Sequence, residues 1–272
     1  MTTQFEIGVI GSGNAAEGIV HGVLRKSVLL DDRIVASDPH ADRRRVFADR
    51  FKIAVTDDNR YVVENSYIII LAVKPQQYAA VCDDFADLVR EDHVIVSIMA
   101  GVSTRSIEAR FPNVDARVVR VMPNLPMHVG AGMAGVHAGT HAREVDILRA
   151  QRIFEAGGRT IIIEDEALMD AVTAVSGSGP AYFYYFVEAL TAAGQRAGLS
   201  QQQADILAKQ TCLGAARMMI ESGDTPAVLR EKVMSPGGTT QAAIEFFSHK
   251  SLFDTIQDGV LAAWQRSQEL GR

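Results

Sequence analysis

The chain has 272 residues, of which 47% are hydrophobic and 22% are charged, and its formal net charge is -6. This length predicts two domains, and the acidic balance argues against a nucleic-acid partner. The two cysteines lack metal-ligand spacing, and we find neither a signal peptide nor an apolar run long enough to span a membrane, so we expect a cytoplasmic protein without a metal site.

The first part of the chain alternates between two kinds of segment, up to about Ile163. Short runs rich in valine and isoleucine predict strands over Phe5–Ile10, Arg33–Ser37, Tyr67–Ala72, His93–Ser97, Arg117–Met122 and Thr160–Ile163, with Gly132–His137 as a candidate for one more. Helical spacing lies between them, over Ala15–Leu24, Ala41–Phe51, Gln76–Val89, Ser103–Phe111 and Ala142–Ala156. Continuous apolar strands that alternate with helices predict an α/β domain, with a Rossmann-type parallel sheet covered on both faces.

After Asp165 only helical patterns follow. Apolar residues keep helical spacing from Ala181 to Leu199, and Ser200 with Gln203 predicts a capping box that opens a second helix through Met219. Ser251 with Asp254 predicts another capping box, for a helix that runs to about Leu270. We therefore expect an α/β domain over residues 1–163 and an all-α domain over residues 164–272.

A glycine-rich turn follows the first strand. Gly11 permits the tight turn, and Gly13 lets the backbone approach a pyrophosphate at the N-terminus of the next helix. Glycines also occur in turns that bind nothing, but this place after the opening strand of an alternating β/α half favours a dinucleotide site. The candidate cofactor-binding residues of the turn are Gly11, Ser12, Gly13, Asn14 and Ala15.

The ends of later strands extend this candidate site. The second strand ends at Ser37 and Asp38, where such folds meet the adenosine ribose: an acid favours the free 2′-hydroxyl of NAD, whereas a nearby arginine, as in Arg43–Arg45, favours NADP. The sequence leaves the coenzyme open at this point. Ligands of open parallel sheets bind at the carboxyl ends of the strands, which adds Ser37, Ala72, Val73, Lys74, Pro75, Met99 and Ala100 to the candidate cofactor-binding residues.

Two motifs stand out in the helical half. Ser176–Ala181 and Ser235–Thr240 each combine hydroxyl side chains, a flexible glycine-rich turn and the start of a helix. Unpaired N–H groups at a helix N-terminus favour anions, although serine and threonine at such places also serve as simple caps. Two such motifs in a cofactor-dependent protein favour the binding of a carboxylate.

These motifs carry a resemblance to a known family. Asp170–Tyr182 and Val233–Thr240, with Gly11–Ala15, Ala72–Pro75 and Val121–Pro126, resemble the pyrroline-5-carboxylate reductases, and the match runs essentially end to end. The resemblance implies a dinucleotide-binding Rossmann domain followed by a helical substrate-binding and dimerisation domain. The implied activity is the last step of proline biosynthesis, in which hydride from NAD(P)H reduces the cyclic imine 1-pyrroline-5-carboxylate to L-proline.

The resemblance also implies a coenzyme, an assembly and roles for particular residues. NADPH is slightly favoured over NADH. The assembly is a homodimer at least, with a decamer of dimers as the larger alternative. Thr240 is the expected catalytic residue, its hydroxyl facing the ring nitrogen, while backbone N–H groups around Gly238, Thr239 and Thr240 hold the substrate carboxylate. Glu166 and Ser178 join the expected substrate site, and Asn59 the cofactor side.

Several residues depart from the family pattern. Ala15, Leu125, Met127 and His128 replace residues of other sizes, and the charged Glu17, in the first turn of the glycine-loop helix, is expected to face solvent. Two other hypotheses stay open. One is a related β-hydroxyacid dehydrogenase that uses Lys209 or Lys232, and the other is a dinucleotide-binding protein without turnover.

Overall fold

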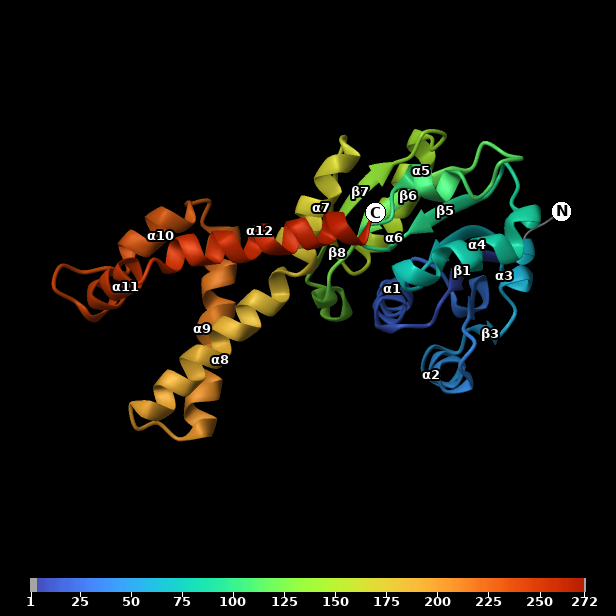
Figure 1. Cartoon of the computed structure of the whole chain (residues 1–272). Coiled ribbons are helices and arrows are strands. Elements are labelled where there is room, and N and C mark those ends of the chain that lie inside the picture. Colours follow the sequence, from blue (N-terminus) through green and yellow to red (C-terminus); the bar gives the residue numbers. More distant parts are fainter. Residues whose placement is uncertain (1–3, 272) are drawn as a thin grey trace. The chain divides into compact units, whose positions relative to one another are not determined.

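The computed structural model describes residues 4–271, and its strands form one mixed sheet (Figure 1). The eight strands lie in the order β3-β2-β1-β4-β5-β6-β7-β8, and every neighbouring pair is parallel except the antiparallel pair β6 and β7. They are β1 (Phe5–Ile10), β2 (Ile34–Ser37), β3 (Ala54–Thr56), β4 (Ser66–Leu71), β5 (Val94–Ser97), β6 (Arg117–Met122), β7 (Gly132–Ala138) and β8 (Gly158–Ile162). The prediction of a Rossmann-type α/β sheet domain is confirmed.

Helices cover both faces of this sheet because its strands are apolar on both sides. In β4, Ile68 and Ile70 pack into one hydrophobic cluster, while Ile69 and Leu71 pack into the other. Successive side chains of a strand point to opposite faces, so a continuous apolar run has both faces buried. The helices are α1 (Asn14–Arg25), α2 (Ala41–Phe51) and α6 (Glu144–Glu155) against the first cluster, and α3 (Asn59–Asn65), α4 (Tyr78–Phe85) and α5 (Thr104–Glu108) against the second.

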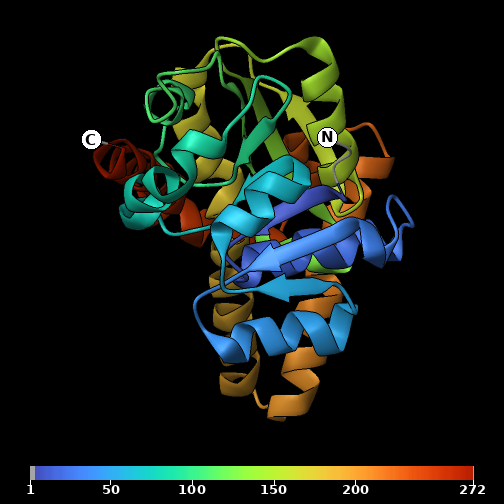
Figure 2. The ribbon, with the colours of Figure 1, turned by 90° about the vertical axis from the view of Figure 1, so that its right-hand side faces the viewer.

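The parallel register places the carboxyl ends of the central strands in one row. Ile10 of β1 pairs with Ser37 of β2 and with Leu71 of β4, and Leu71 pairs with Ser97 of β5. In Figure 2 the blue strands β1, β2 and β3 run side by side. The loops that follow these strands therefore share one edge, where ligands of such sheets bind.

The chain divides into two compact units. The first extends to Ser178 and includes the chain again from Ala263, while the second is Gly179–Ala262. The second unit contains α8 (Gly179–Arg196), α9 (Gln201–Glu221), α10 (Pro226–Lys232), α11 (Thr239–His249) and most of α12 (Leu252–Leu270). The division at Ser178 lies later than the boundary expected after residue 163, which stays a prediction. Among residues 4–271, no helix is long and apolar enough to cross a membrane.

One of the two predicted capping boxes forms. The Ser200 hydroxyl accepts from the backbone N–H of Gln203, and the Gln203 side chain accepts from the backbone N–H of Ser200. The prediction at Ser251 is wrong, because its φ is 51° and an N-cap residue needs an extended backbone.

The last turns of α12 pack within the first unit. The Ser267 hydroxyl donates to Oδ1 of Asp170 at 2.7 Å. Gly101, in the loop after β5, has a φ of 76°, and a Cβ there would lie 2.9 Å from the backbone nitrogen of Gly271. The backbone of the chain's last turn thus lies directly on the loop that follows β5.

His93 gives the fold a sensitivity to acid. Burial, with the nearby charge of Arg90, lowers the pKa of His93 to about 4, and its Nε2 has no hydrogen-bond partner among the described residues. The unfolded chain takes up a proton near pH 6.5, whereas the folded chain resists it down to about pH 4. Stability attributable to this group is therefore complete above pH 6.5 and falls as the pH drops towards 4, by at most about 3 kcal/mol.

We expect the variant His93→Gln to lose less stability than the wild type between pH 7 and pH 4.5. The measurement is the midpoint of chemical denaturation at both pH values and at one protein concentration. Equal losses in the two proteins would contradict this account of His93.

Candidate active site

The glycine loop makes a turn that only glycine fits. Gly11 has a φ of 96°, and a Cβ on it would lie 2.7 Å from the carbonyl oxygen of Ala72. Its own N–H donates to the carbonyl oxygen of Ser37 at 2.9 Å. The turn therefore packs directly on the ends of β2 and β4, and the predicted cofactor residues Gly11, Ser37 and Ala72 lie together.

The N-terminus of α1 offers unpaired donors beside open space. Gly13 caps the helix without a side-chain hydrogen bond, and a Cβ built on it would meet nothing within 4 Å. Within α1 the first backbone N–H with a partner is that of Glu17, which donates to the Gly13 carbonyl. The N–H groups of Asn14, Ala15 and Ala16 have no acceptor among the described residues. Three free donors at a positive helix end fit the pyrophosphate of a dinucleotide.

Other predicted cofactor residues take different positions at the same edge. Ser37 donates its hydroxyl hydrogen to Oδ1 of Asn59 at 2.7 Å, which joins two residues predicted from separate segments. Lys74 is exposed and no partner of its ammonium group is present among the described residues, so it is available to an anion. Met99 is 2% exposed within the apolar core, so only its backbone faces the edge of the sheet.

Asp38 is bound to the glycine loop. Its Oδ2 accepts from the backbone N–H of Ser12 at 2.9 Å, and its Oδ1 accepts from the backbone N–H of His40 at 2.9 Å. Burial alone would raise the pKa of Asp38, but these hydrogen bonds and the nearby His40 ring lower it below its ordinary value. Asp38 therefore stays ionised and holds the loop against the end of β2.

Glu17 does not face solvent as the sequence led us to expect. Its side chain is 14% exposed and pairs with Arg43 at 3.0 Å and with Arg50. Arg43 also donates from Nε to the carbonyl oxygen of Ser12 at 2.7 Å. The expectation was wrong because both arginines come from α2, which lies against α1.

Glu166, predicted to line the substrate site, is occupied by contacts within the first unit. Its carboxylate accepts from the backbone N–H of Thr104 at 2.7 Å and from the Thr104 hydroxyl at 2.8 Å. Arg120, whose side chain is 5% exposed, donates to it at 3.2 Å and lies 3.6 Å from Asp170. Because both carboxylate oxygens have partners, Glu166 links the start of α5 to Arg120 of β6. Its contact with substrate stays a prediction.

The Ser176–Ala181 motif is not the flexible turn that we expected. Residues Thr173–Gly177 form a π-helix, in which the Ser178 N–H donates to the Thr173 carbonyl at 2.8 Å, and α8 begins at Gly179. Asn124, which follows β6, donates its side-chain amide to the carbonyl of Ser176 at 3.1 Å. Single π-turns are frequent at functional sites. Asn124 was not among the predicted site residues, although it lies in Val121–Pro126, one of the motifs that carry the family resemblance.

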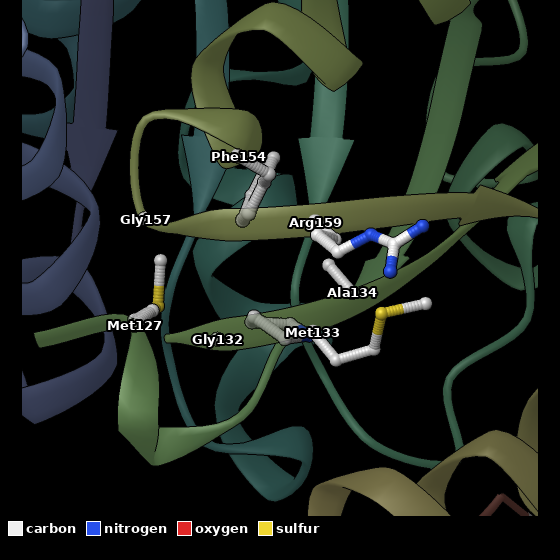
Figure 3. A pocket seen from close by; sticks show the side chains of 8 residues that line it. Met127, Gly132, Met133, Ala134, Phe154, Gly157 and Arg159 are labelled. Atoms are coloured by element: carbon white, nitrogen blue, oxygen red, sulfur yellow. The ribbon is translucent and has the colours of Figure 1, made fainter. Parts of the chain in front are cut away.

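Met127 and His128 pack where a glycine makes room for them. A Cβ on Gly18 would lie 2.9 Å from Met127 and 3.0 Å from Nε2 of His128, which is itself 3.0 Å from the carbonyl oxygen of Asn14. Figure 3 shows the Met127 side chain directed towards the turn at Gly157. The small hollow beside it has no room for even a water molecule, so we regard it as a packing defect and not as a ligand site.

The second unit carries the remaining predicted substrate residues at the start of α11. The Gly238 N–H donates to the Ser235 carbonyl at 2.9 Å, so Gly238 is not a free donor. The N–H groups of Thr239, Thr240 and Gln241 have no acceptor among the described residues, and Gly238 caps α11 without a side-chain hydrogen bond. These three donors, rather than that of Gly238, are available to a carboxylate.

The lysines required by the dehydrogenase hypothesis are both paired. Lys209 contacts Asp205 at 2.8 Å and Lys232 contacts Asp224 at 2.5 Å. Among residues 4–271, no group of three His, Cys, Asp or Glu side chains is placed to hold a metal ion.

Comparisons with known proteins cover both units. The family model described as pyrroline-5-carboxylate reductase dimerisation matches residues 166–270, and the model described as NADP oxidoreductase, coenzyme F420-dependent, matches residues 6–101. The chain is 41% identical to the pyrroline-5-carboxylate reductase of Pseudomonas aeruginosa, over 97% of this chain and 96% of that one. The identity to the enzyme of Arabidopsis thaliana is 38%, over 99% and 96%.

Solved structures agree with these matches. A pyrroline-5-carboxylate reductase from Coxiella burnetii is 35% identical with a TM-score of 0.90, covering 99% of this chain and 100% of that one. The Plasmodium falciparum pyrroline carboxylate reductase, solved with NADP bound, is 26% identical with a TM-score of 0.90 and full coverage of both chains.

Proposed function

The chain belongs to the pyrroline-5-carboxylate reductase family, and from that premise we propose how its residues reduce 1-pyrroline-5-carboxylate to L-proline with NAD(P)H. The observation that carries the proposal is that one chain, 41% identical to such an enzyme along its length, holds both the open glycine loop and the Ser235–Thr240 motif. The open N-terminus of α1 fits the pyrophosphate of the coenzyme. The step belongs to amino-acid biosynthesis, and we place the enzyme in the cytoplasm.

The first unit binds and orients the coenzyme. The free N–H groups of Asn14, Ala15 and Ala16 bind the pyrophosphate, and Ser37 with Asn59 contacts the adenosine end. A bound reduced nicotinamide supplies the hydride. The loop at Met99 and Ala100 would hold the ring through its backbone, because the Met99 side chain is buried in the core.

The second unit supplies the groups that hold the imine. The N–H groups of Thr239, Thr240 and Gln241 bind the substrate carboxylate at the N-terminus of α11. The Thr240 hydroxyl faces the ring nitrogen, which must be protonated or strongly hydrogen-bonded to accept hydride at the neighbouring carbon. A threonine is a weak acid, so Thr240 orients or relays the proton. Holding the two reactants in contact supplies most of the rate.

The reductase assay tests the whole proposal. We expect the purified protein to oxidise NADPH or NADH only after pyrroline-5-carboxylate is added. No turnover with either coenzyme, in protein that still binds one of them, would favour the alternative of a dinucleotide-binding protein without turnover.

Thr240→Ala separates catalysis from binding. We expect kcat to fall about 100-fold while the Kd of the coenzyme changes less than twofold, because only the proton-orienting hydroxyl is lost. Thr240→Ser, which keeps a hydroxyl, should recover most of the rate. If Thr240→Ser lost as much rate as Thr240→Ala, and both variants also lost thermal stability, Thr240 would instead be a helix cap.

The assembly follows from the same family membership. A dimerisation domain indicates an oligomer, and we propose that the Ser235–Thr240 motif of one subunit serves the dinucleotide of its partner. A homodimer is the minimum, and the decamer of dimers stays a prediction.

A further inference from the structure

We propose that Glu17 determines coenzyme specificity: it withholds Arg43 and Arg50 from the 2′-phosphate of NADPH and so favours NADH. This inference rests on the proposed function, since it assumes that the dinucleotide binds at the glycine loop. Nothing in the sequence pattern assigns Glu17 a role, and an acid in the first turn of this helix is at first sight unfavourable for a bound pyrophosphate.

The position of Glu17 explains how the acid is tolerated. It lies in the first turn of α1, yet its side chain is only 14% exposed and contacts two guanidinium groups of α2. Its charge is thus neutralised within the protein. The same contacts engage both arginines, although one carboxylate leaves the three groups with one net positive charge.

Arg43 is held at three points. Besides the ion pair at 3.0 Å, its Nε donates to the Ser12 carbonyl at 2.7 Å, and its guanidinium lies 5.9 Å from the centre of the Phe47 ring. These contacts fix the plane of the guanidinium, so Arg43 cannot turn towards a phosphate without breaking them. Arg43 therefore braces the glycine loop instead of binding the coenzyme.

The surroundings of the adenosine end complete the argument. Asp38, at the end of β2, is ionised and beside the loop, and Arg44 donates to the Asp38 carbonyl at 2.7 Å and pairs with Asp57 at 3.5 Å. Arg45 is exposed, but it follows Arg43 by two positions, and residues so spaced lie on opposite faces of a helix. A 2′-phosphate would therefore meet a carboxylate and arginines that already have acidic or carbonyl partners, whereas a 2′-hydroxyl carries no charge.

Direct binding of NADH and NADPH tests this inference without turnover. Titration by nicotinamide fluorescence on the full chain should show tighter binding of NADH in the wild type. In Glu17→Gln the released arginines should lower the Kd of NADPH about tenfold relative to that of NADH, the gain of one charge-assisted hydrogen bond.

Asp42→Asn is the matched control. Asp42 is an exposed acid in the first turn of α2, next to Arg43 in the chain, so its loss changes the net charge equally without releasing an arginine. We expect it to leave the ratio of the two Kd values within twofold. Arg45→Gln, which leaves the Glu17 contacts intact, should also leave this ratio unchanged.

The outcomes separate the two proposals. If the wild type binds neither coenzyme, the dinucleotide site itself is wrong. If both bind but Glu17→Gln leaves their ratio unchanged, or shifts it no more than Asp42→Asn does, only the role of Glu17 is overturned. Weaker NADPH binding in Arg45→Gln overturns it as well, and does so even if Glu17→Gln fails to fold.

Discussion

Replacing Gly11 by alanine is expected to abolish coenzyme binding and to lower the free energy of unfolding by about 3 kcal/mol. Two costs add. The backbone at Gly11 has a φ of 96°, which side chains rarely adopt, and the new methyl group would lie 2.7 Å from the carbonyl oxygen of Ala72. Because that neighbour is backbone at the end of a buried strand, it cannot turn aside, and the loop itself must move.

Gly13→Ala is the matched comparison for this prediction. Gly13 has a φ of -76°, and its methyl group would meet nothing of the protein within 4 Å. We expect it to keep the thermal midpoint of the wild type but to weaken coenzyme binding, since the methyl group takes space proposed for the pyrophosphate. Denaturation and fluorescence titration measure the two effects separately. Wild-type coenzyme binding by Gly11→Ala would contradict the proposed loop.

A charge placed on the apolar surface of the second unit is expected to break the oligomer and to unfold that unit. In α8, Phe183 is 60% exposed and Phe186 is 46% exposed. In α11, Phe246 is 60% exposed. The buried residues of α8 and α9 are limited to Gly179, Ala204 and Ala208, and α10 and α11 have none. A unit without its own core depends on a second copy to bury these side chains.

Phe183→Asp and Phe246→Asp, compared with Gln202→Asp, test this dependence. Gln202 is already polar and exposed on α9, so the added charge there should change nothing. For the two phenylalanine variants we expect light scattering to show dissociation and circular dichroism to show lost helix content. A folded, active monomer from either variant would contradict it.

The sequence predicted most of the sheet because its central strands are continuous apolar runs that are buried on both faces. All seven expected strands form, including β7, whose pairing with β6 is antiparallel. The strand β3 and the helix α3 were missed. The first has three residues, Ala54–Thr56, and the second seven, Asn59–Asn65, which is too short for a periodic pattern to show.

The candidate site was predicted less completely because its contacts join distant segments. Glycine spacing locates the loop, since the local turn alone requires Gly11. No local pattern reveals that Glu166 reaches Thr104, 62 residues away, or that Glu17 reaches Arg43, 26 residues away. Such pairs depend on which helices and strands become neighbours, and a single sequence records that only indirectly.

The close packing of Gly101 on Gly271 also decides how the protein should be handled. An affinity tag or a truncation at the carboxyl end would disturb this backbone contact, which lies next to Met99 and Ala100. We expect such a change to lower turnover although it alters no reacting group. A mutant series made with a carboxyl-terminal tag would therefore measure the effect of the tag together with that of the mutation.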